Sequence, residues 1–132
     1  NTPVAKKHTQ IPFKGLNKRH VLISVEGKLK KEASELVQNL MKACQLSMDD
    51  VAFIDAREQE ASLAEIIERL RIEKAILFGI PTSDSGLPFD EEEKIVHHHG
   101  CSFLRTAPPE TLKSNEPKKR ALWNALKMLF EL

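Results

Sequence analysis

Hydrophobic and polar positions follow two alternating patterns between residues 20 and 79. Three short apolar runs rich in β-branched residues, at 20–25, 51–55 and 74–79, predict buried strands. Between the first two runs, residues 29–44 carry apolar side chains at helical spacing, which predicts an amphipathic helix of about four turns. Between the last two, Ser62 and Glu65 form a candidate capping box for a second helix over 62–70. Buried strands that alternate with helices predict a parallel sheet covered on both faces.

The pattern becomes less regular after residue 79. Residues 79–94 predict a long polar loop, and short apolar runs at 95–96 and 102–104 predict two further short strands. Asn115 is a candidate N-cap for a last helix, with Pro117 in its first turn and an apolar stripe that runs to Phe130. The predicted fold class is α/β: a three-layer α/β/α arrangement around a mostly parallel sheet of four or five strands.

The length, charge and composition of the chain limit the classes of function that the protein can have. The chain has 132 residues, which suits one domain, and its net charge of +1 gives no general attraction to nucleic acid or membrane. Aromatic residues make up 5%, too few for a base-stacking surface, so direct nucleic-acid binding is expected to be weak or absent. No apolar run is long enough to span a membrane. Two distant cysteines, Cys44 and Cys101, fit a reducing compartment, and we expect a cytoplasmic protein.

The first 19 residues differ from the rest. They contain five Lys and Arg residues and no acidic residue, and Pro3, Pro12 and Gly15 interrupt any periodicity, which predicts a flexible basic tail at 1–19 and a single α/β domain at 20–132. Ile11, Phe13 and Leu16 are large apolar residues within this tail. The tail is therefore interpreted either as a docking peptide with these three anchors, as a solubilising end, or as a weak, salt-sensitive nucleic-acid contact.

The loop after the third strand is a candidate ligand site. Ligands of open α/β sheets bind at the carboxyl ends of strands, where this loop places Gly79, Pro81, Ser83, Asp84 and Gly86. The loop matches neither phosphate-binding glycine pattern, and its acidic residues would repel phosphate, so a plain connection is the favoured interpretation. Nowhere does the sequence place a nucleophile in a recognisable catalytic motif. We therefore expect no enzymatic activity and no cofactor.

The histidine run at 97–99 is a candidate metal site. On a strand, His97 and His99 share one face, and Cys101 is the one local candidate for a third zinc ligand. The spacings of known zinc modules are absent, so a solvated run of histidines is the favoured interpretation. Stoichiometric zinc in the purified protein would decide between the two.

The C-terminal half resembles a known family. Phe78-Gly79, the acidic loop, Phe103-Leu104-Arg105-Thr106-Ala107-Pro108, Leu112, Asn115-Glu116-Pro117 and Lys119-Arg120-Ala121-Leu122-Trp123 resemble the psi subunit of bacterial DNA polymerase III in order and spacing. The resemblance implies a non-catalytic adaptor whose N-terminal segment docks on a replication clamp-loader complex and whose folded domain binds the chi subunit. The tail lacks the family's tryptophan, so Phe13 would be its principal anchor.

Two further expectations follow from this resemblance. Trp123, on the last helix, is interpreted either as an aromatic at the edge of the core or as a second partner contact. Psi-like folds are similar to those of uracil-DNA glycosylases, which gives the alternative function: a nucleotide- or base-binding protein, or a divergent glycosylase-like enzyme, that uses the 79–89 loop. Here the histidines are followed by Gly100 and Cys101, not by the proline and serine of that family.

Overall fold

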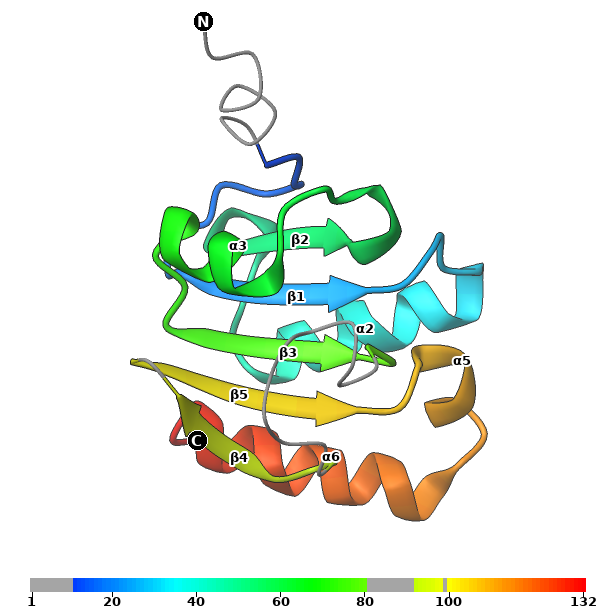
Figure 1. Ribbon diagram of the computed structural model, residues 1–132. Helices are drawn as coiled ribbons and strands as arrows, with labels where there is room; N and C mark the ends of the chain where they lie inside the picture. Colours follow the sequence, from blue (N-terminus) through cyan, green and yellow to red (C-terminus); the bar gives the residue numbers. More distant parts are fainter. Residues whose placement is uncertain (1–10, 81–91, 99) are drawn as a thin grey trace, which may run out of the picture.

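The protein is an α/β domain with one five-stranded sheet flanked by helices (Figure 1). The computed structural model describes residues 11–80, 92–98 and 100–132. The strands are β1 (Val21–Val25), β2 (Val51–Asp55), β3 (Lys74–Phe78), β4 (Ile95–His98) and β5 (Cys101–Thr106). The helices are α2 (Lys31–Ala43), α3 (Leu63–Leu70), α5 (Pro109–Leu112) and α6 (Glu116–Leu129), with short 3-10 turns at η1 (Met48–Asp50) and η2 (Ala56–Glu58).

The strand order is β2-β1-β3-β5-β4. The first four strands of this order are parallel, and β4 pairs antiparallel with β5 at one edge. The expected α/β class with a mostly parallel sheet is therefore confirmed, with five strands in it. The antiparallel edge follows from the short connection between β4 and β5, since Gly100, at a φ of +78°, lies in the turn that joins them.

Helices cover the two faces of the sheet unequally. Helices α2, α5 and α6 pack on one face, where alternate residues of β1 such as Val21 and Ile23 enter the larger core. Helix α3 packs on the other face with Leu22, the residue between them, and with Ile54 of β2. The alternation follows from the two-residue period of a strand, and both faces of β1 are apolar because both are covered.

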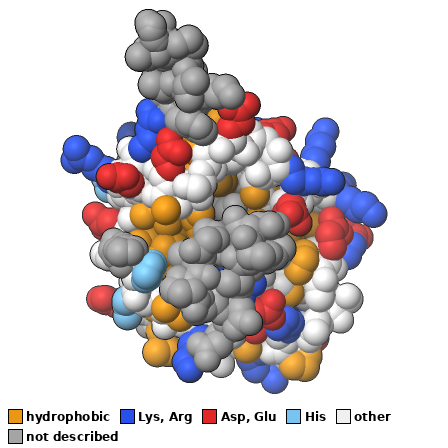
Figure 2. Space-filling model, viewed as in Figure 1, with side chains coloured by type: hydrophobic (Ala, Val, Ile, Leu, Met, Phe, Trp, Pro, Cys, Tyr) orange, Lys and Arg blue, Asp and Glu red, His pale blue; other side chains and the backbone are white. Residues whose placement is uncertain are grey.

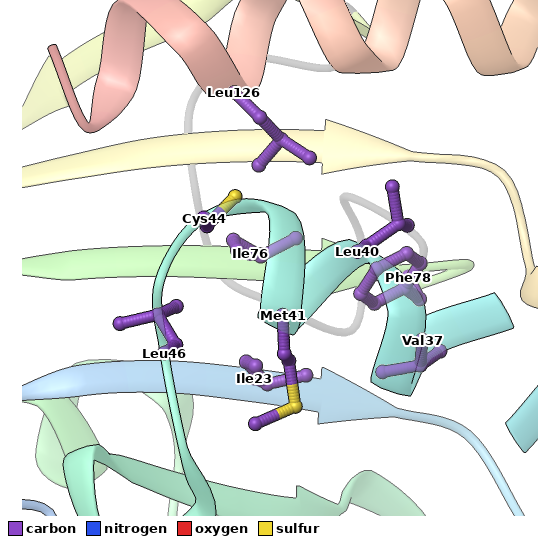
Figure 3. A pocket seen from close by; sticks show the side chains of 9 residues that line it. All are labelled: Ile23, Val37, Leu40, Met41, Cys44, Leu46, Ile76, Phe78 and Leu126. Carbon is purple, nitrogen blue, oxygen red and sulfur yellow. The ribbon is translucent and has the colours of Figure 1, made fainter. Parts of the chain in front are cut away.

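The larger core leaves only a minor void between α2, α6 and the sheet (Figure 3). Its volume is about 10 Å³, and the side chains around it, including Met41, Cys44 and Leu126, present no polar surface to it. A space of this size is at the lower limit for one water molecule, and it offers no polar partner. We interpret it as ordinary packing between two helices rather than as a ligand site.

Two N-cap residues that the sequence predicts, Ser62 and Asn115, are confirmed at helix starts, the first by its N-cap hydrogen bond alone. The Ser62 hydroxyl accepts a hydrogen bond from the Glu65 backbone N–H at 3.1 Å at the start of α3. The Asn115 side chain accepts from the Lys118 backbone N–H, also at 3.1 Å, with Pro117 in the first turn of α6. These caps satisfy donors that a helix start leaves without a partner, which is why short-range sequence patterns locate them.

The N-terminal segment from residue 11 packs on the domain, which differs from the expectation of a flexible tail through residue 19. Lys14 forms an antiparallel bridge with Phe53, with hydrogen bonds of 2.9 Å in both directions. The backbone N–H groups of Asn17, Lys18 and Arg19 each donate at 2.9 Å to carbonyls of residues 49–51. The segment thus pairs with the outer side of β2, whose backbone groups would otherwise need other partners. Residues 1–10 lie outside the described residues.

Gly15 permits this close approach. Its φ is +95°, and a Cβ there would lie 2.3 Å from the Val51 carbonyl oxygen and 2.4 Å from that of Met48. Both the left-handed backbone and the contact exclude a side chain at this position. Gly15, which the sequence suggests only as an interruption of periodicity in a flexible tail, is therefore part of the contact between the segment and the domain.

Candidate protein-docking site

Exposed apolar side chains concentrate at the β2 edge. Five large hydrophobic residues are exposed among those the structure describes, and three of them, Phe13, Leu16 and Met48, belong to the N-terminal segment and the turn η1 beside it. Their exposed fractions are 37%, 59% and 41%. The Leu16 backbone N–H donates to the Met48 carbonyl at 3.3 Å, so the two chain segments are adjacent. We call Phe13, Leu16 and Met48 the edge surface.

A groove of about 640 Å³ adjoins the edge surface. Phe13 lines it from the N-terminal segment, Phe53 from β2, and Leu29 from the connection that leads into α2. Helix α2 packs over β1 and β3 through contacts to Ile23 and Ile76, and it leaves Phe53, one strand further out, only partly buried. The groove therefore exists because the helical layer stops short of the edge strand.

The segments that flank the groove are basic. Residues 11–20 and 26–31 contain Lys14, Lys18, Arg19, Lys28, Lys30 and Lys31, against the single acidic residue Glu26. All six cationic residues are exposed, and in residues 11–80, 92–98 and 100–132 none of them forms an ion pair. Asp55, at the groove, accepts hydrogen bonds from the Gly27 and Arg57 backbone N–H groups at 2.7 and 2.9 Å. The cations are thus available to an acidic partner.

The structure separates the four predicted partner-binding residues. Phe13 and Leu16 lie on the edge surface, but Ile11 is only 9% exposed and packs in the α3-side core. Ile11 therefore holds the segment on the domain instead of presenting a surface to a partner. Trp123 lies on α6, partly buried against the larger core, with Lys127 Nζ 5.9 Å from its ring centroid. Helix α6 is at the opposite end of the sheet from β2, so Trp123 is remote from the edge surface (Figure 1).

Of the five residues predicted to form a ligand site in the loop after β3, only Gly79 lies among the described residues. Gly79 has a φ of +69°, and a Cβ there would lie 2.7 Å from Pro108 Cγ. Its N–H donates to the Thr106 carbonyl at 2.8 Å. These contacts explain the glycine by close packing between the ends of β3 and β5. Pro81, Ser83, Asp84 and Gly86 lie outside the described residues.

The candidate metal ligands do not converge. In the antiparallel register His97 lies opposite Ser102, and His98 lies opposite Cys101, so His97 and Cys101 face opposite sides of the sheet. His97 Nδ1 is 2.8 Å from Ser102 Oγ, a contact between cross-strand neighbours. His99 lies outside the described residues, and no group of three residues suited to a metal ion occurs in the part that is described.

Burial makes both thiols poor nucleophiles and ligands. It raises the pKa of Cys44 to about 11 and that of Cys101 to about 12. Both are buried free cysteines, so they remain protonated at neutral pH. The two thiols are thus interpreted as small core side chains.

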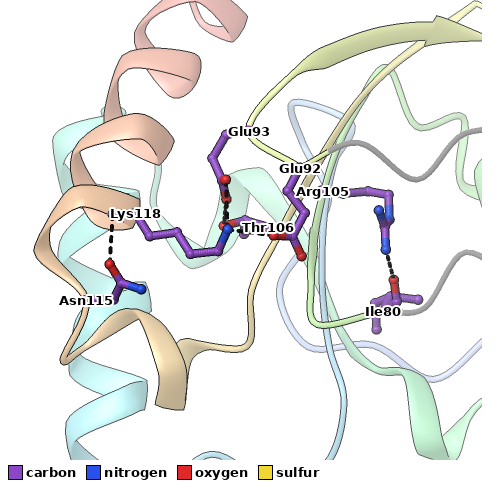
Figure 4. Close-up of polar contacts among 7 residues, drawn as sticks. All are labelled: Ile80, Glu92, Glu93, Arg105, Thr106, Asn115 and Lys118. Atoms are coloured by element: carbon purple, nitrogen blue, oxygen red, sulfur yellow. Dashed lines mark hydrogen bonds and ion pairs between the residues drawn. The ribbon is translucent and has the colours of Figure 1, made fainter.

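A polar network at the start of α6 was missed by sequence reasoning (Figure 4). Lys118 Nζ lies 2.6 Å from Glu92 Oε1 and 3.1 Å from Glu93 Oε1, and these contacts raise the pKa of the ammonium group. Thr106 Oγ1 donates to Glu93 Oε2 at 2.5 Å. Two acidic residues of the predicted polar loop thus hold the start of the β4 region against α6. No local spacing indicates this contact, because Glu93 and Lys118 are 25 positions apart.

Arg105 belongs to the segment that carries the family resemblance, but no local pattern in the sequence indicates its structural role. It lies on β5, is 8% exposed, and donates from Nη2 to the Ile80 carbonyl at 2.9 Å (Figure 4). A charged group so deeply buried needs polar partners, and this one stabilises the chain where it leaves β3.

Among the described residues, no helix combines the length and apolar character that crossing a membrane requires.

Comparison with known proteins gives no family assignment. The chain matches no protein-family model, and no curated protein is significantly similar to it.

Proposed function

We propose that this protein is a non-catalytic adaptor, similar to the psi subunit of bacterial DNA polymerase III, that docks on a clamp-loader complex through its N-terminal region. The observation that supports this proposal most strongly is the edge surface: Phe13, Leu16 and Met48 are exposed along the β2 edge, and Phe13 also lines a groove there. Exposed apolar residues that follow one edge and border a groove are typical of a protein interface.

The charges around the groove favour an acidic partner. Lys14 and Lys28 line it together with Asp55 and Glu58, and the excess of positive charge comes from Lys18, Arg19, Lys30 and Lys31 on the flanking segments. The occupant we propose is a clamp-loader segment with an apolar anchor side chain between acidic residues. The anchor would fill the groove between Phe13 and Phe53, and the acidic residues would pair with the lysines and accelerate association.

Trp123 supports a second, separate contact of the same adaptor. It is partly buried on α6, at the end of the sheet remote from β2. An adaptor must hold two partners at once, and two surfaces at opposite ends of the sheet suit that task. We propose that the α6 surface around Trp123 binds the second partner.

The test measures binding of the full chain to immobilised bacterial clamp-loader complex by surface plasmon resonance. The double variant Phe13→Ser, Leu16→Ser should bind at least about tenfold more weakly than wild type, equivalent to roughly 1.4 kcal/mol. Met128→Ser is the matched control, because Met128 is 73% exposed but lies on α6. Its binding through the N-terminal region should be unchanged.

Two results would contradict the proposal. One is absence of binding by the wild-type chain, and the other is equal loss in the edge-surface variant and the Met128 control. Uracil excision by the wild-type protein from single-stranded DNA would favour the glycosylase-like alternative instead.

A further inference from the structure

A second cavity lies on the α3 side of the sheet, where β1 and β3 end. Its volume is about 220 Å³. Ser24 and Glu26 line it from the end of β1, Leu77 from β3, and Leu63 from the first turn of α3. Figure 2 shows the molecule from this side, with charged side chains mainly around the rim and hydrophobic ones visible between them. The carboxyl ends of parallel strands are where open α/β sheets bind ligands.

One polar side chain that lines this cavity lacks a protein partner. Ser24 is 2% exposed, and its hydroxyl makes no hydrogen bond within the described part of the chain. A hydroxyl at a cavity wall with no protein partner favours an occupant that supplies polar atoms.

The charges around the cavity have both signs. The Arg57 side chain packs over Gly27, where a Cβ would lie 2.6 Å from Arg57 Nη1, and in the described chain its guanidinium forms no ion pair. The start of α3 adds backbone N–H groups, of which the Ser62 hydroxyl satisfies only that of Glu65. Glu26 supplies an opposing carboxylate. An occupant with one positive and one negative group suits this arrangement better than a phosphate dianion.

We propose that this cavity binds a free α-amino acid with an aliphatic side chain. The ligand carboxylate would be held by Arg57, the Ser24 hydroxyl and the start of α3, and the ammonium group by Glu26. Ile54, Leu63 and Leu77 supply the apolar wall for the side chain. The volume lies below the range of about 300–1,000 Å³ that is usual for drug-sized ligands, which disfavours a nucleotide. The proposal does not depend on the adaptor function.

The test is a titration of the isotope-labelled full chain with L-leucine, followed by amide chemical shifts in NMR spectra. Saturable shifts should appear at residues 61–64 and at Ser24. Two probes that each lack one charged group, 4-methylpentanoate and isoamylamine, should bind at least tenfold more weakly, and inorganic phosphate should not compete.

Variants locate the site. Arg57→Gln and Ser24→Ala should each weaken leucine binding, the former at least tenfold, while Arg120→Gln, which removes an exposed charge from α6, should leave it unchanged. Both cavity variants are checked for an unchanged fold in the same spectra. Three results would overturn the proposal. They are the absence of saturable shifts with leucine, competition by phosphate, and leucine binding by the folded Arg57→Gln and Ser24→Ala variants that equals that of the wild-type protein.

Discussion

The N-terminal segment should both stabilise the fold and bind a partner, through different side chains. Ile11 is 9% exposed and packs in the α3-side core, whereas Leu16, five residues later, is 59% exposed. The comparison of Ile11→Ala with Leu16→Ala therefore tests the packing of this segment with two aliphatic truncations of similar size. Only the first should affect the free energy of unfolding substantially.

The magnitude follows from burial. Replacing a core isoleucine by alanine costs about 2–5 kcal/mol, and Ile11 lies at the rim of its core, so we expect about 2 kcal/mol. For a domain of this size that is roughly 6–10 °C in melting temperature. Leu16→Ala should stay within about 0.5 kcal/mol, as is usual for exposed positions.

Urea denaturation followed by circular dichroism measures both effects. Truncation provides an independent check: removal of residues 1–10 retains Ile11 and all hydrogen bonds between the segment and β2, whereas removal of residues 1–19 loses them. The longer truncation should lower stability more than the shorter one does. Equal stability of Ile11→Ala and Leu16→Ala would refute the packing of the segment described above.

Two other predictions concern positions where backbone or burial is decisive. Gly79→Ala should destabilise the fold more than Gly100→Ala in urea denaturation, because both glycines have positive φ but only Gly79 would place a Cβ against another residue, 2.7 Å from Pro108 Cγ; equal losses would contradict the packing explanation. Cys44 and Cys101 should react slowly with a thiol reagent at pH 8 in the native protein. The free energy of unfolding should fall as pH rises above 9, because the thiols ionise near that pH when unfolded but only near 11 and 12 when folded. Fast native labelling, or no such fall relative to a variant with both cysteines replaced by alanine, would contradict the raised pKa values.

Much of the fold is predictable from local patterns. The amphipathic stripe expected over 29–44 corresponds to α2 at Lys31–Ala43, and the Ser62 and Asn115 caps are where short-range chemistry places them. Each of these features depends on residues within a few positions of one another. The strand order is not local, and neither is the pairing of residues 11–19 with β2, whose partners are more than 30 positions away.

The candidate site illustrates the same limit. Phe13 and Leu16 could be selected from sequence because large apolar residues are unusual in a basic segment, but Ile11 looks the same in sequence and is buried. Phe53 reads as an ordinary strand residue, and its place in the groove depends on α2 stopping short of β2. The register of β4 on β5 likewise decides that His97 and Cys101 face apart, although their spacing of four in sequence does not exclude a shared site.

Site-specific photo-crosslinking tests the proposed docking most directly. A photoreactive phenylalanine analogue is placed at position 13, or at position 128 as a control, and the full chain is irradiated with bacterial clamp-loader complex. The adaptor proposal predicts a covalent product with a clamp-loader subunit from position 13, suppressed by excess wild-type protein, and none from position 128. No product at position 13, with the protein folded and the probe active, would contradict it.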